Sequence, residues 1–138
     1  MAASYFEFKA PKQCELADQF IPGAIACCID GSTEVCNKPL DEAVVPGLYR
    51  SLKLNADPLG STTKPVSEAM VRNAVAIGVA LVMLDVGTGF HFVLVDDITV
   101  DKFRVADPKY IDPKPLDWAT LSSAYGNGSI EQAWSVNK

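Results

Sequence analysis

A single histidine restricts where imidazole chemistry can take place in this 138-residue chain. His91 stands in the apolar run Gly-Phe-His-Phe-Val-Leu-Val (89–95), which predicts a strand with His91 on the same face as Val93 and opposite Phe92. Taken alone, such a histidine is usually a core or strand-edge residue whose ring bonds a backbone carbonyl. Any chemistry at His91 therefore depends on the groups that the fold brings to its ring.

The first such group is a carboxylate, Asp107, which stands 16 positions after His91 in the sequence Val-Ala-Asp-Pro (105–108). Two strands joined by a tight connection place the start of the first beside the end of the second, so Asp107 is predicted to lie beside His91. There it would bond one imidazole nitrogen and fix the tautomer of the ring. The alternative is a local role, because Asp-Pro commonly initiates a turn.

The second group is a thiol, Cys14, which stands 77 positions before His91. A helix predicted over 14–21 would place Cys14 near its N-terminus, where the helix dipole and a nearby imidazole would favour the nucleophilic thiolate. The alternative for Cys14 is a semi-buried thiol with no chemical role.

The remaining cysteines, Cys27, Cys28 and Cys36, form no C-x-x-C pair, so zinc binding and thioredoxin-like redox chemistry are not indicated. Cys27 and Cys28 lie in an apolar run, which predicts small buried side chains, with a disulfide framework as the alternative. The acidic pair Asp96-Asp97 lacks the spacing of a calcium loop and is predicted to form a solvated turn. No metal or cofactor is expected.

The elements that would position these residues place helices first and strands afterwards. Helices are predicted over 14–21, 24–29, 40–52 (interrupted by Pro46-Gly47), 67–77 and 118–125. Strands are predicted over 4–9, 79–84, 90–95, 100–106 and 130–136. Residues 55–64 are predicted to form a loop, and 107–117 an extended segment. Ser67 is the predicted cap of the 67–77 helix and Gly78 its end. This order predicts one α+β domain over 1–138, without linker or repeat.

Composition supports a globular chain and disfavours several classes of partner. Hydrophobic residues make up 49% of the chain, and 12 basic against 17 acidic residues give a net charge of −5, which argues against nucleic-acid binding. No apolar run of 18 residues exists, so no membrane span is expected. The first residues do not resemble a cleaved signal peptide, which predicts a cytoplasmic protein or one exported by a leaderless route. Trp118 and Trp134 are expected to pack in the core.

The sequence resembles the papain-like cysteine peptidases of bacteria in the order of four features. These are Cys14, a helix-Gly-strand unit, Gly-Phe-His-Phe-Val-Leu-Val and Val-Ala-Asp-Pro. It is most similar to their compact group, which includes the double-glycine bacteriocin-leader peptidases and related effector proteases. The best-matching stretch is 71–110, and the ending Tyr125…Ile130…Ala133-Trp134 also fits. The resemblance implies N-terminal helices packed on a C-terminal antiparallel sheet. It also implies a thiol protease or amidase that cleaves a peptide or isopeptide bond of a peptide or protein substrate.

By the same resemblance, Cys14 would be the nucleophile, His91 the general base and acid, and Asp107 the orienting carboxylate. In that family, a glutamine several residues before the nucleophile donates a hydrogen bond to the oxyanion. Here Phe8 stands six positions before Cys14, so the sequence departs from the family at this point. Gln13 and Gln19 are the candidate replacements.

A second alignment places Ile21 where the nucleophile would stand, since Ile-Pro-Gly-Ala-Ile-Ala (21–26) also resembles the nucleophile helix. The chain would then be a catalytically degenerate domain that keeps His91 and Asp107 and binds a peptide or partner protein.

Overall fold

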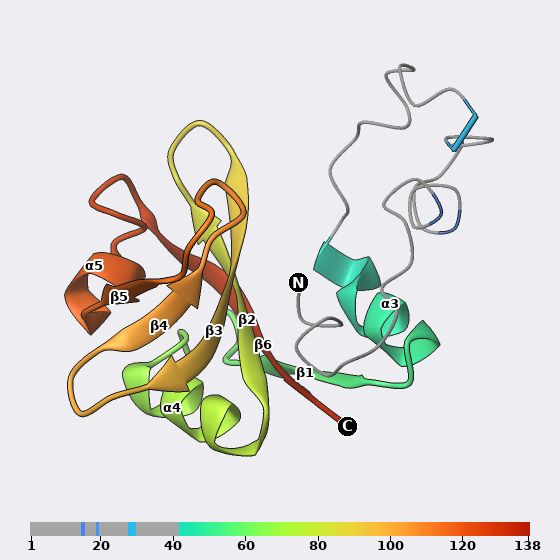
Figure 1. Cartoon of the computed structure of the whole chain (residues 1–138), viewed down its shortest axis with the longest axis horizontal. Coiled ribbons are helices and arrows are strands. Elements are labelled where there is room, and N and C mark those ends of the chain that lie inside the picture. The colour runs from blue at the N-terminus through green and yellow to red at the C-terminus, as the bar shows by residue number, and fades with distance from the viewer. Residues whose placement is uncertain (1–14, 16–18, 20–27, 30–41) are drawn as a thin grey trace. The chain divides into compact units, whose positions relative to one another are not determined.

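The computed structural model describes Glu15, Gln19, Cys28, Ile29 and residues 42–138 (Figure 1). The chain divides after Leu54 into two compact units, and each unit is described by itself. The single-domain organisation and the packing of N-terminal helices on the sheet stay predictions.

In the N-terminal unit, a short 3-10 helix, η2 (Glu42–Val44), leads directly into the helix α3 (Val45–Ser51). Pro46 lies in the first turn of α3, where its missing N–H removes no helical hydrogen bond, so the proline begins the helix and does not interrupt it. Tyr49 is buried in this unit, and burial raises the pKa of its phenol to about 12.

Cys28 differs from its predicted environment. It is exposed, lies in a turn and is disulfide-bonded, so the prediction of a small buried thiol is wrong for this residue. The alternative prediction, a disulfide, applies to Cys28, and its sulfur is therefore not a free thiol.

The C-terminal unit is built on one six-stranded antiparallel sheet with the strand order β1-β6-β2-β3-β4-β5 (Figure 1). The strands are β1 (Asn55–Leu59), β2 (Val79–Asp85), β3 (Phe90–Ile98), β4 (Phe103–Ala106), β5 (Lys114–Leu116) and β6 (Ser129–Asn137). β2 and β6 are neighbours inside the sheet although they are far apart in the sequence. Helices together with this antiparallel sheet confirm the α+β class.

Two helices of this unit begin at capping side chains. α4 (Glu68–Ile77) starts after Ser67, whose hydroxyl accepts from the Met70 amide, as predicted. α5 (Trp118–Ser122) starts after Asp117, whose carboxylate accepts from the Thr120 amide at 2.7 Å. Both helices are shorter than a stable isolated helix, so their packing on the sheet must stabilise them.

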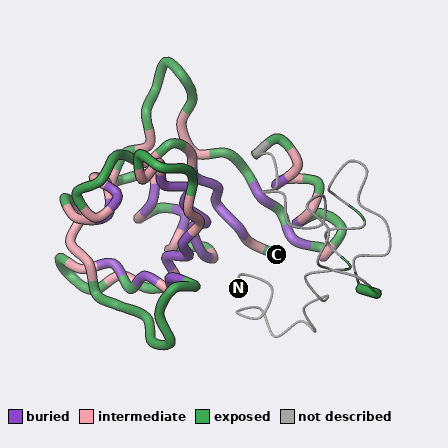
Figure 2. The backbone as a smooth tube through the Cα atoms, turned by 90° about the horizontal axis from the view of Figure 1, so that it is seen from above, coloured by how far each residue is buried: buried purple, intermediate pink, exposed green. Residues whose placement is uncertain are grey.

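The core lies between these helices and one face of the sheet. α4 contacts β6, β2 and β3, and α5 contacts β6. Figure 2 shows that buried residues concentrate in the strands inside the sheet, whereas residues of the connecting loops are exposed. The Trp118 ring packs against the Phe103 ring of this core with centroids 5.7 Å apart. Trp134 is buried on the other face of β6, where its ring stacks on that of Phe92 with centroids 6.2 Å apart, so both tryptophans pack in the interior as predicted. The shared cluster contains Val71, Ala74, Ala80, Val82, Leu84, Val93, Val95, Phe103, Val105, Leu121, Ala124 and Ala133.

Three sequence predictions in this unit are wrong. Residues 107–117, predicted as extended, begin with a turn in which the Tyr110 amide bonds the Asp107 carbonyl. The predicted loop over 55–64 contains β1, which pairs along its whole length with β6. The predicted turn at Asp96-Asp97 belongs to β3, and the true turn follows it, where the Thr99 amide bonds the Lys102 carbonyl. Asp96 stays in the strand because Arg104 of β4 binds its two carboxylate oxygens, at 2.7 and 2.9 Å.

Candidate functional site

His91 is the second residue of β3, near the end of the sheet where β2 and β3 are joined. It pairs with Leu84 of β2 and shares the face of Val93, which is fully buried in the core. The imidazole lies at the margin of this core, and its side chain keeps 30% of its surface exposed. The imidazole of His91 therefore packs against the core on one side and is exposed to solvent on the other.

The pairing of β3 with β4 brings Asp107 to His91. Leu94 pairs with Ala106, so the next step of the antiparallel ladder sets Val93 against Asp107. His91 then lies two residues further along β3, diagonal to Asp107 and on the same face. His91 Nε2 and Asp107 Oδ1 are 2.8 Å apart, a hydrogen bond between the two residues that the sequence predicted to meet.

Asp107 also performs the local turn role that was its alternative. Its Oδ1 accepts from the Lys109 amide at 2.8 Å, and its carbonyl accepts from the Tyr110 amide at 2.9 Å, with Pro108 at the second position of the turn. The two roles are compatible, because one carboxylate oxygen can accept two hydrogen bonds. The turn therefore helps to hold Asp107 at the end of β4.

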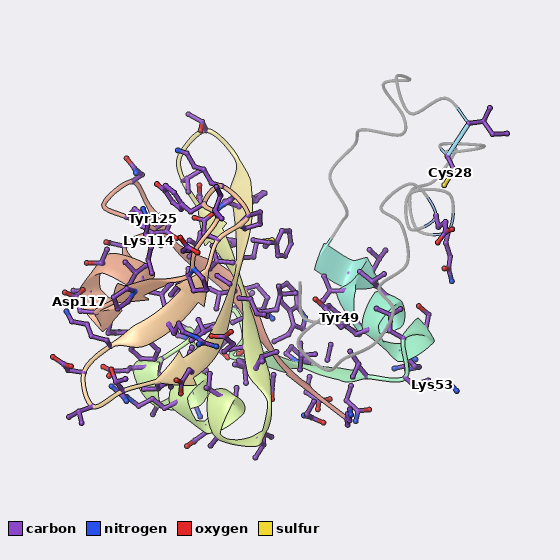
Figure 3. All side chains as sticks on the ribbon, in the orientation of Figure 1. Cys28, Tyr49, Lys53, Lys114, Asp117 and Tyr125 are labelled. Atoms are coloured by element: carbon purple, nitrogen blue, oxygen red, sulfur yellow. The ribbon has the colours of Figure 1, made fainter. Side chains whose placement is uncertain are left out.

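A third side chain, Tyr125, completes the hydrogen bonds of Asp107. Its hydroxyl donates to Asp107 Oδ2 at 2.9 Å. Tyr125 lies in the segment after α5 and is labelled in Figure 3. The sequence assigned it no chemical role, because no spacing rule connects a residue after a helix with a carboxylate 18 positions earlier.

Hydrogen bonds keep Asp107 ionised although its side chain is only 5% exposed. Burial raises the pKa of the Asp107 carboxyl, but the hydrogen bonds from the Lys109 amide, His91 and Tyr125 outweigh burial and hold the pKa below 3.8. For Tyr125, burial and then the bond to Asp107 raise the pKa of the phenol well above 10.0, so it remains a protonated donor.

This charge arrangement fixes the roles of the two imidazole nitrogens of His91. An ionised carboxylate only accepts hydrogen bonds, so the bond to Asp107 requires a proton on Nε2. In the neutral ring, Nδ1 then carries the lone pair and is the basic nitrogen. The pair can therefore orient His91 as a base that acts through Nδ1.

The other predicted site residues are less fully described. Cys14 and Gln13 lie outside the described residues. Gln19 is helical and exposed. Within the residues described, no group of three or more His, Cys, Asp or Glu side chains could hold a metal ion. The described part of the chain also contains no helix long and apolar enough to cross a membrane.

Comparison with protein-family models, with curated proteins and with solved structures finds no match to this chain.

Proposed function

We propose that this chain is a cysteine-dependent hydrolase that cleaves a peptide or isopeptide bond by acyl transfer to Cys14. The observation that carries the proposal is the 2.8 Å hydrogen bond between His91 Nε2 and the buried carboxylate of Asp107. A carboxylate that orients an imidazole is the supporting half of a nucleophile–base–orienter triad. The resemblance of the sequence to papain-like peptidases supplies the thiol as the missing third member.

The state of His91 suits this chemistry. Nδ1 is the basic nitrogen, and the partly exposed ring is accessible to an incoming group. A histidine that served only to fill the core would need no ionised, threefold hydrogen-bonded carboxylate beside it, since a backbone carbonyl would satisfy one ring nitrogen.

In the first half of the reaction, His91 Nδ1 takes the proton of the Cys14 thiol, and the thiolate attacks the carbonyl carbon of the substrate. A carbon–sulfur bond forms, and the tetrahedral oxyanion collapses as the carbon–nitrogen bond breaks. The imidazolium gives its proton to the leaving amine, so the ring returns to the neutral state. Asp107 stabilises the transient imidazolium and keeps its tautomer, without itself becoming protonated.

In the second half, water attacks the thioester while His91 accepts one of its protons. The carbon–sulfur bond breaks, a carboxylic acid product leaves, and Cys14 regains its proton. The oxyanion donors proposed from the sequence are the amide of Cys14 with Gln13 or Gln19. Loss of a side-chain donor would lower the rate by roughly 10²–10³-fold.

The proposal is tested by incubating the full chain with a library of synthetic peptides and identifying new termini by mass spectrometry. We expect cleavage by the wild-type chain and none by Cys14→Ala or His91→Ala, because each variant removes a reacting group. Asp101→Asn, which changes an exposed side chain outside the proposed machinery, is the control and should cleave like the wild type.

Cleavage that persists in Cys14→Ala would contradict the proposed nucleophile. If no peptide is cleaved but some are retained by the wild-type chain, the degenerate binding domain is the correct alternative.

A further inference from the structure

We propose that Tyr125 is a positioning residue, whose phenol fixes the plane of the Asp107 carboxylate so that Oδ1 stays directed at His91 Nε2. The inference rests on the proposed function for its catalytic meaning, but the geometry that supports it involves only described residues. Neither the sequence patterns nor the resemblance to papain-like peptidases assigned Tyr125 this role.

The Asp107 carboxylate needs a restraint on its rotation. An aspartate side chain turns broadly about its last torsion, and a single hydrogen bond leaves that rotation open. In Asp107 the two oxygens are held from different parts of the chain. The Lys109 amide holds Oδ1 at 2.8 Å, and the Tyr125 hydroxyl holds Oδ2 at 2.9 Å. Two anchors on two oxygens define a plane, and His91 Nε2 meets Oδ1 in this arrangement at 2.8 Å.

The backbone around Tyr125 is shaped to deliver the phenol. Ala124 and Tyr125 adopt φ angles of 47° and 60°, in the left-handed region that non-glycine residues seldom occupy. Hydrogen bonds compensate for this conformation, because the Tyr125 amide bonds the Thr120 carbonyl and the Gly126 amide bonds the Ser123 carbonyl, both at 2.9 Å. Uncommon backbone conformations in a well-bonded segment often mark functional positions.

The phenol is also a dependable donor. Burial and the bond to Asp107 raise the pKa of Tyr125 well above 10.0, so its hydroxyl stays protonated while Asp107 stays ionised. A water molecule in the same place would satisfy Oδ2 but would not be tied to the core through a side chain.

The single histidine makes the test direct, because the imidazole proton of a tag-free, ¹⁵N-labelled full chain is a unique NMR signal. We expect the Nε2 proton of His91 to exchange with solvent at least about tenfold faster in Tyr125→Phe than in the wild type. This factor corresponds to about 1.4 kcal/mol of lost protection. Tyr125→Phe keeps the aromatic ring, so packing is preserved, and thermal unfolding of the variant verifies the fold.

Tyr110→Phe is the matched control, since the Tyr110 phenol lies in the same neighbourhood, but among the described side chains Asp107 accepts from His91 and Tyr125 and not from Tyr110. It should exchange at the wild-type rate. When Tyr125→Phe is combined with Asp107→Asn, it should raise the exchange rate of the His91 Nε2 proton by less than twofold. The reason is that a positioning effect acts through the carboxylate. A purely structural effect of the phenol would persist in that background.

Exchange in Tyr125→Phe within twofold of the wild type would overturn the inference, as would an equal effect of the substitution in both backgrounds. If the peptide library is cleaved, kcat of Tyr125→Phe should fall about tenfold with little change in KM. If no peptide is cleaved but the exchange result holds, the proposed function fails while the positioning role of Tyr125 stands.

Discussion

At the scale of single residues, Asp107 connects the described groups around His91. It bonds His91, Tyr125 and the Lys109 amide, and its ionised state determines which imidazole nitrogen is basic. The sequence predicted the pairing of His91 with Asp107 because strand alternation and a short connection fix which residues meet across a hairpin. Tyr125 was not predictable in this way, since its approach depends on how the segment after α5 folds back.

The buried charge of Asp107 leads to a pH-dependent stability. The folded-state pKa lies below 3.8, so the unfolded chain binds this proton more readily than the folded chain. The stabilisation is therefore complete above about pH 5 and is lost as the pH falls through 3.8 towards the lower folded-state value. We expect Asp107→Asn to lower the free energy of unfolding by about 1–3 kcal/mol at pH 7, with a smaller difference from the wild type at pH 3.

Urea unfolding of both proteins at the two pH values measures this difference. Asp112→Asn, an exposed aspartate in the same loop, is the control and should follow the wild type at both. An equal gap between wild type and Asp107→Asn at pH 7 and pH 3 would show that the charge of Asp107 does not stabilise the fold.

At the scale of elements, strong local signals were predictable and sheet partners were not. The helix α4 followed from its Ser67 cap and apolar spacing, and β2, β3 and β6 followed from apolar runs. β1 was predicted as a loop because Asn55, Asp57 and Pro58 disfavour a strand, and it forms because β6 supplies a pairing partner. The Asp96-Asp97 pair was predicted as a turn because its cross-strand partner, Arg104, cannot be located from composition alone.

The connection between α4 and β2 shows how close packing restricts a single position. A Cβ atom on Gly78 would stand 2.2 Å from the Val136 carbonyl oxygen of β6, and this obstacle is backbone. We expect Gly78→Ala to lower the free energy of unfolding by roughly 1–3 kcal/mol, because the helix end or the strand must shift.

Gly47→Ala provides the comparison, since a Cβ atom there meets nothing within 4 Å and the residue lies in α3. It should leave stability unchanged or raise it by up to about 1 kcal/mol. Equal effects of the two substitutions in chemical denaturation would show that β6 does not approach Gly78 as closely as described.

At the scale of the whole molecule, the proposed chemistry requires groups from two distant parts of the chain. His91, Asp107 and Tyr125 belong to the unit that begins at Asn55, whereas Cys14 stands in the sequence before Leu54. The fold class and the orienting pair were predictable because they depend on local patterns and one hairpin. The proposed approach of the thiol to this pair would depend on contacts between residues more than half the chain apart, which sequence spacing does not determine.

Alkylation of each cysteine in the native chain by iodoacetamide, with rates measured by peptide mapping, tests directly whether His91 activates Cys14. We expect Cys14 to react faster than the other thiols, and His91→Ala to slow its reaction by roughly 10- to 30-fold at pH 7, because a thiol of ordinary pKa is then only about 3% thiolate. Cys28 should stay unmodified unless it is reduced, since it is disulfide-bonded. Equally slow labelling of Cys14 in the wild type and in His91→Ala would show that His91 does not activate this thiol.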